Sequence, residues 1–114
     1  MQIKMFPDWP NLVGRKQAFV GSGVGPASYV SGGDTVVLTG YNTYIDSITG
    51  QSVTVSNNYV LQYQPSIAGP RATWKAKWLY AIGNTVGGTA GNEVTAATNL
   101  SGESVVVSGF ASGT

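Results

Sequence analysis

Short runs of apolar and β-branched residues, each ended by glycine, proline or asparagine, dominate this sequence. No segment of about a dozen residues places apolar side chains three and four positions apart, which is the spacing that predicts a helix. Short runs broken by turn-forming residues are instead typical of strands joined by tight connections. The sequence therefore predicts an all-β chain.

The clearest strand lies within Arg71–Gly83, which reads RATWKAKWLYAIG. Successive side chains of a strand point to opposite faces of its sheet. One face of this strand carries Trp74, Ala76, Trp78, Tyr80 and Ile82, and the other carries Thr73, Lys75, Lys77, Leu79 and Ala81. We expect the first face to enter the core and the two lysines to face water.

The remaining strands are expected in runs that lie between turn signals. They are Gln17–Ser22, Asp34–Tyr41, Thr43–Ile48, Gln51–Ser56, Tyr59–Pro65, Asn92–Thr98 and Glu103–Phe110. Thr49-Gly50 and Asn57-Asn58 are expected to be tight turns, because glycine and asparagine tolerate the backbone conformations that hairpins need. About eight short strands favour an antiparallel β-sandwich or small barrel, immunoglobulin-like or jelly-roll-like.

The chain has the length of one domain. Residues 1–16 are expected to form an extended N-terminal arm or edge segment, and residues 17–114 a single β-sandwich domain. Pro7 and Pro10 flank Trp9 in the first segment. Proline has no backbone N–H to give to a central strand, which places this segment outside the core.

Two stretches, Ser31–Tyr41 and Ser101–Phe110, repeat one pattern: an acid, a hydroxyl residue, three aliphatics, a second hydroxyl residue, glycine and an aromatic. Three consecutive aliphatic residues predict a strand that is covered on both faces, and the glycine permits a bulge or a close approach. The leading acids, Asp34 and Glu103, are expected to be solvated. The repeat has two explanations: equivalent inner strands, or an old internal duplication.

Composition excludes several classes of function. Charged residues make up 10% of the chain, against about 25% in a typical soluble protein. The net charge of +1 gives no basic field for nucleic acid. Without cysteine or histidine, we expect no disulfide, no metal and no cofactor. We also find no signal peptide and no apolar run long enough to span a membrane.

Catalysis is not expected either. Without histidine, a serine or threonine nucleophile lacks its usual base. The glycine-rich runs are not followed by the lysine and helix of a phosphate-binding loop. Lys75 and Lys77 lie on the opposite face from Trp74 and Trp78, which disfavours single-stranded nucleic acid. The two tryptophans could bind sugar rings only if their face were exposed.

The segments GPASYVSGGD, TNLSGESVVVSGF and WKAKW resemble small head decoration, or cement, proteins of tailed bacteriophages. The resemblance extends to size and to the glycine- and threonine-rich β composition. It implies a non-enzymatic β-sandwich that binds junctions of the major capsid protein, as a homo-oligomer such as a trimer or as repeated copies. It also implies synthesis in the host cytoplasm and a final location on the capsid surface of the virion.

Candidate interface residues follow from this reading, with no catalytic, cofactor-binding or metal-binding residue expected. They are Met5, Phe6, Trp9, Arg15, Tyr29 and Tyr41, since large side chains commonly anchor protein interfaces. The alternative function is a carbohydrate-binding or adhesin-like β-sandwich module, such as a phage tail or fibre domain.

Overall fold

The computed structural model describes residues 1–5, 11–13, 16–39, 43–52, 59–66, 73–84 and 87–113. These ranges contain eight strands and no helix, so they contain no helical segment that could cross a membrane. The strands are β1 (Gln2–Met5), β2 (Asn11–Val13), β3 (Lys16–Val24), β4 (Asp34–Thr39), β5 (Thr43–Ser52), β6 (Tyr59–Ser66), β7 (Thr73–Tyr80) and β8 (Ser104–Gly113). The all-β prediction is confirmed.

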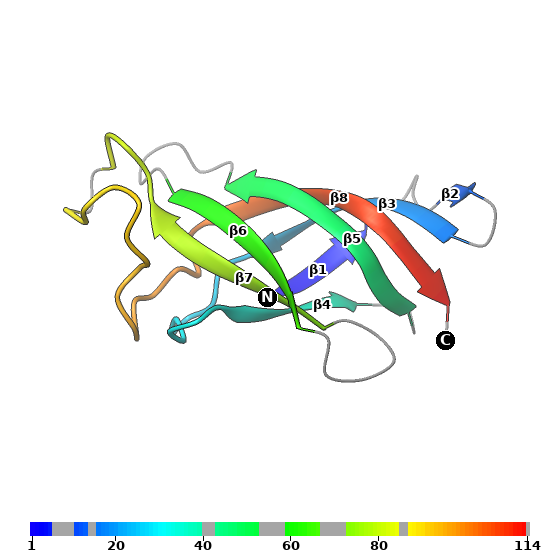
Figure 1. Ribbon diagram of the computed structural model, residues 1–114, viewed down its shortest axis with the longest axis horizontal. Helices are drawn as coiled ribbons and strands as arrows, with labels where there is room; N and C mark the ends of the chain where they lie inside the picture. The colour runs from blue at the N-terminus through cyan, green and yellow to red at the C-terminus, as the bar shows by residue number, and fades with distance from the viewer. Residues whose placement is uncertain are drawn as a thin grey trace.

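Seven strands form one curled sheet in the order β5-β8-β3-β1-β4-β7-β6, and β2 pairs with β3 beside this path. The two end strands, β5 and β6, come into contact, which nearly closes the sheet into a barrel (Figure 1). All pairs in this order are antiparallel except β1 with β4, which run parallel. The fold is thus the expected small sandwich or barrel, with mixed rather than purely antiparallel pairing.

The repeated phrase forms β4 and β8, but its aliphatic residues are covered on only one face. The inward members are Val36, Leu38, Val105 and Val107, all buried. Between them, Val37 is 48% exposed and Val106 is 38% exposed. The expectation of cover on both faces is wrong, because a single curled sheet has an inside and an outside, and no other described segment of the chain covers Val37 or Val106.

The glycine of the second phrase has the role that the pattern predicts. The register between β5 and β8 shifts between Ile45 and Ser47, which makes Asp46 the extra residue of a β-bulge. A Cβ atom on Gly109 would lie 2.0 Å from the carbonyl oxygen of Ser47. Only glycine therefore lets β8 pass this close to the bulge.

Two predicted elements are wrong. The expected turn at Thr49-Gly50 lies inside β5, which runs without a break beside β8. Gly50 is extended, with φ of 158°, and its missing Cβ allows close contact with the carbonyl oxygen of Val106. The run Asn92–Thr98 is not a strand, because its contribution to the sheet is a single bridge between Glu93 and Leu79. Asn57-Asn58 lies outside the described residues.

The first five residues are part of the domain rather than an arm. Strand β1 lies between β3 and β4 in the sheet (Figure 1), and Ile3 is wholly buried. The amino group of Met1 forms an ion pair with Asp34 and donates a hydrogen bond to the carbonyl of Thr35. The prediction of an N-terminal arm or edge segment over residues 1–16 is therefore wrong for Met1–Met5, because β1 has a neighbouring strand on each side. The prolines that suggested it come later and lie outside the described residues.

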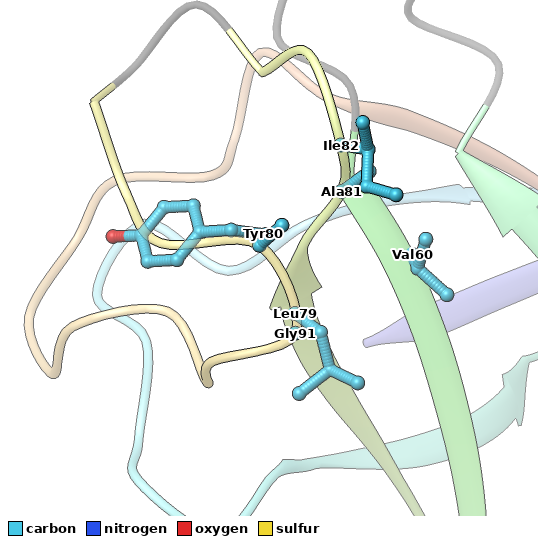
Figure 2. A pocket seen from close by; sticks show the side chains of 7 residues that line it. Val60, Leu79, Tyr80, Ala81, Ile82 and Gly91 are labelled. Carbon is cyan, nitrogen blue, oxygen red and sulfur yellow. The ribbon is translucent and has the colours of Figure 1, made fainter.

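Strand β7 shows the predicted alternation as far as Tyr80. Ala76 and Trp78 are wholly buried, Trp74 and Tyr80 pack against the core, and Lys75 is exposed. The alternation does not extend to Ile82, which lies beyond the end of the strand and is 87% exposed (Figure 2). The prediction that Ile82 lies in the core is wrong, because the chain turns after Tyr80 and no longer follows the alternation of β7.

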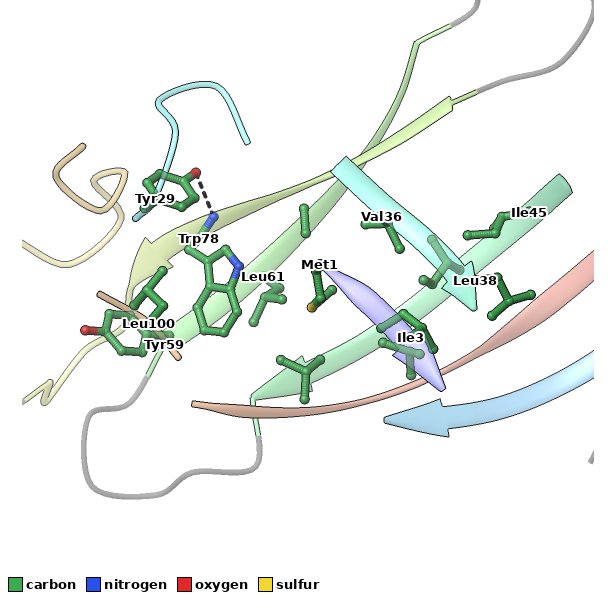
Figure 3. Packing of buried hydrophobic residues seen from close by; sticks show 14 of the residues in the cluster. Met1, Ile3, Tyr29, Val36, Leu38, Ile45, Tyr59, Leu61, Trp78 and Leu100 are labelled. Atoms are coloured by element: carbon green, nitrogen blue, oxygen red, sulfur yellow. Dashed lines mark hydrogen bonds between the residues drawn. The ribbon is translucent and has the colours of Figure 1, made fainter. Parts of the chain in front are cut away.

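Trp78 lies in the middle of the buried cluster at the β6–β7 side of the barrel (Figure 3). The ring of Tyr59 meets it edge-on, with ring centroids 5.7 Å apart and an interplanar angle of 74°. This geometry contributes about 1 kcal/mol beyond the area that the two rings bury. The aromatic face predicted for β7 thus anchors the core.

Candidate functional site

The side chains of Asp34, Asp46 and Glu93 each have a structural contact. Asp34 pairs with the amino terminus, and Asp46 accepts a hydrogen bond from the Ser112 hydroxyl. Glu103 is 4% exposed, so the expectation that it would be solvated is wrong. Its backbone holds neighbouring turns, since its N–H donates to Leu100 and its carbonyl accepts from Gly25. In the ranges that the structure describes, no three potential metal-ligating residues gather in one place.

Glu93 and Tyr29 form a hydrogen-bonded network that ties two loops to β7. The Tyr29 hydroxyl donates to Glu93 Oε2 over 2.7 Å, and the Gly32 N–H donates to the same oxygen over 2.7 Å. The Ser31 hydroxyl lies 3.4 Å from Glu93 Oε1. The backbone N–H of Trp78 in turn donates to the Tyr29 hydroxyl over 3.1 Å (Figure 3).

The network shifts the pKa values of its two titratable groups, Glu93 and Tyr29. Burial opposes ionisation of Glu93, but the donors Tyr29 and Gly32 and the charge of Lys77 outweigh it and hold the pKa of Glu93 below its usual value. Burial raises the pKa of Tyr29, and the hydrogen bond to Glu93 raises it further. A carboxylate held ionised beside a neutral phenol strengthens a structural contact rather than a proton transfer.

Tyr29 therefore serves the fold, and only 2% of it is exposed, which leaves little of the side chain for a partner. Sequence reasoning placed it at an interface and missed its bond to Glu93. The two residues are 64 positions apart, and no local pattern links them.

Of the other predicted interface residues, the structure describes only the backbone of Met5. The backbone of Met5 lies in β1 opposite Gly21. Phe6, Trp9, Arg15 and Tyr41 lie outside the described residues.

The tryptophans of WKAKW do not form a surface platform. Trp78 is wholly buried. Trp74 is partly buried, and its indole N–H donates to the carbonyl oxygen of Ile45 over 2.8 Å. The lysines occupy the opposite face of β7, as expected, so no paired tryptophan surface faces solvent there.

The outward side of β3, β8 and β5 is a broad surface with little charge, and we call it the β8 face. β8 pairs with β3 on one side and with β5 on the other along nearly its whole length. The outward side chains include Ala18, Val20, Ser22, Val24, Tyr44, Ser47, Thr49, Ser104, Val106, Ser108, Phe110 and Ser112, and the register of β3 places Lys16 opposite Ser112. Asp46, at the bulge, adds a charged group that is hydrogen-bonded to Ser112.

Four large apolar side chains are exposed among the hydroxyl groups of this face. Val24 is 53% exposed, Phe110 41%, Tyr44 39% and Val106 38%. Phe110 borders a shallow hollow of about 350 Å³ that Val20, Thr49 and Ser108 also line. Such a mixture of aromatic, aliphatic and hydroxyl groups suits contact with another macromolecule.

No protein-family model, curated protein or solved structure matches this chain. We take the β8 face as the candidate functional site because of its composition, exposure and continuity across three strands.

Proposed function

We propose that this chain is a viral structural protein that decorates the capsid exterior, with its β8 face against junctions between major capsid protein subunits. The composition of that face carries the proposal: exposed Phe110, Tyr44 and Val106 lie among hydroxyl groups. Protein interfaces are depleted of charge and enriched in aromatic residues at their centres. The resemblance of the sequence to phage head decoration proteins supports the choice of partner.

A decoration protein stabilises a shell by adding contact area at many equivalent places. Each copy needs to bury only about 800 Å² per partner, because many copies act on one closed particle. The hydroxyl groups of the β8 face, such as those of Ser104 and Ser108, bond to water in the free protein and can bond to the partner in the complex, directly or through bridging water. With so little charge involved, added salt screens little of the binding energy.

The test is co-sedimentation of the purified chain with expanded capsids assembled from the major capsid protein of the same virus. Wild type is expected to sediment with the capsids, at both low and high salt. Phe110→Asp and Val106→Asp bury a charge in the contact and are expected to weaken attachment by at least about tenfold. Val37→Asp, on β4 two strands beyond β3, is the matched control, because Val37 is similarly exposed.

The proposal is wrong if wild type remains in the supernatant, or if both β8-face variants attach as wild type does. Thermal melting of each variant separates lost attachment from lost folding.

The second candidate is a carbohydrate-binding or adhesin-like module, which the placement of Tyr44 and Phe110 favours. Tyr44 pairs with Ser112, two positions from Phe110 on the same face, so the two rings are diagonal neighbours. Aromatic rings beside hydroxyl groups can contact the apolar faces of sugars and their polar edges. Glycan-array binding that Phe110→Ala abolishes, with no capsid attachment, would establish this function instead.

A further inference from the structure

A second apolar surface lies where β6 and β7 meet the loop that follows β7. Val60, Leu79, Ala81, Ile82 and Ala90 surround a hollow of about 570 Å³, and we call this group the Ile82 patch. Figure 2 shows the side chains of Val60, Leu79, Ala81 and Ile82 on one side of the strand ends, while the ring of Tyr80 points the other way. No charged residue lines the hollow in the part of the chain that the structure describes.

The patch combines a protrusion and a hollow. Ile82 is 87% exposed and Val60 is 41% exposed, so aliphatic groups stand in water beside the apolar depression that they border. Covering an exposed aliphatic side chain of this size with apolar surface is favourable because it removes that surface from water. The surface therefore favours a partner that supplies one apolar side chain for the hollow and a recess for Ile82.

The loop behind Ile82 is held by the side chain of Asn84. Its Nδ2 group donates to the carbonyl oxygens of Ala81 and Gly88 over 3.0 and 2.9 Å. Its Oδ1 atom accepts from the N–H groups of Gly87 and Gly88 over 3.0 and 3.2 Å. These bonds fix the turn that carries Ile82, so little conformational entropy remains to be lost when the patch is covered.

We propose that two copies of this chain pair through the Ile82 patch about a two-fold axis, with Ile82 of each copy in the hollow of the other. A two-fold interface brings a surface against itself, so it must contain both complementary shapes, and this patch does. Self-contact would also bring like charges together, and the lining of this hollow carries none.

This pairing does not depend on the proposed function. It uses β6, β7 and the following loop, whereas the β8 face belongs to β3, β5 and β8. The Ile82 patch comprises few residues compared with the roughly 20–30 residues a side of a standard interface, so we expect a weak dimer that dissociates on dilution.

Sedimentation velocity over a range of concentrations, with the full chain and no capsid protein, tests the pairing. The weight-average mass of wild type is expected to rise from monomer toward dimer as concentration increases. Ile82→Asp is expected to weaken dimerisation by at least about tenfold, because it places a charge in the partner's hollow. Val37→Asp, with a similarly exposed valine on β4, is expected to dimerise as wild type does.

Thermal melting serves as the control for folding, since Ile82 is exposed and its replacement removes no core contact. A chain that is monomeric at every concentration overturns the pairing, as does an Ile82→Asp variant that dimerises like wild type. Equal loss in the Val37→Asp variant also overturns it. A monomer whose capsid attachment requires Ile82 would overturn it too, and would assign the patch to the capsid partner. A dimer that binds no capsid supports the pairing and contradicts only the proposed function.

Discussion

The Tyr29 hydroxyl donates a hydrogen bond to Glu93 and accepts one from the backbone N–H of Trp78. Removal of the hydroxyl oxygen removes both bonds. We expect Tyr29→Phe to lower the free energy of unfolding by about 2–3 kcal/mol, because the buried N–H of Trp78 and the carboxylate of Glu93 each lose a partner. Urea denaturation measures the change. Tyr80→Phe is the matched control, since its hydroxyl makes only long, exposed contacts with Thr95 and its loss should cost less than about 0.5 kcal/mol. Equal losses in the two variants would contradict the role given to Tyr29.

Glu93 makes the stability of the protein depend on pH in the acid range. Its folded-state pKa is lowered relative to the unfolded value of 4.5. The stability that it contributes is therefore complete above pH 4.5, and is lost as the pH falls through the folded-state pKa. Unfolding free energies of wild type and Glu93→Gln, measured over a pH series, should differ by a constant amount at neutral pH and converge in acid. A difference that persists unchanged in acid would contradict this account.

Within the strands, the contact between the bulge of β5 and β8 depends on the absence of a side chain at position 109. Gly109→Ala places a methyl group against the carbonyl of Ser47, and either β8 or the bulge must move. We expect a loss of about 1–3 kcal/mol, the usual cost of overpacking. Gly102→Ala is the matched control, because a Cβ at Gly102 meets no atom within 4 Å. Thermal melting of both variants compares the two positions, and equal melting temperatures would show that the bulge accommodates the methyl group.

Local sequence patterns predicted the strands in which alternating apolar and polar residues distinguish the buried face from the exposed one. The alternation around Trp78 and the run Tyr59–Pro65 correspond to β7 and β6. Patterns failed where partners far away in the chain decide the outcome. Gly50 has the signature of a turn, but β8 lies beside it and keeps β5 extended. The β8 face could not be predicted, because its members come from three strands whose order in the sheet no single strand reveals.

At the scale of the molecule, β1 connects the two halves of the sheet, since it pairs with β3 on one side and with β4 on the other. Deletion of Met1–Met5 is expected to abolish cooperative thermal unfolding, because it removes the central strand and the buried Ile3 side chain. The milder change Ile3→Ala is expected to cost about 2–5 kcal/mol, whereas Gln2→Ala, at an exposed position, should be nearly neutral. A truncated chain that still melts cooperatively would restore the interpretation of this segment as an arm.

The place of β8 between β3 and β5 has a consequence for biosynthesis. Until residues 104–113 have left the ribosome, two long strands made much earlier each present a row of unpaired peptide groups. Before β8 is available, the strands that have already been synthesised can therefore form only part of the sheet. Closure of the sheet between β3 and β5 waits for β8, and chaperones that shield open strand edges should associate with the nascent polypeptide until β8 has emerged and paired.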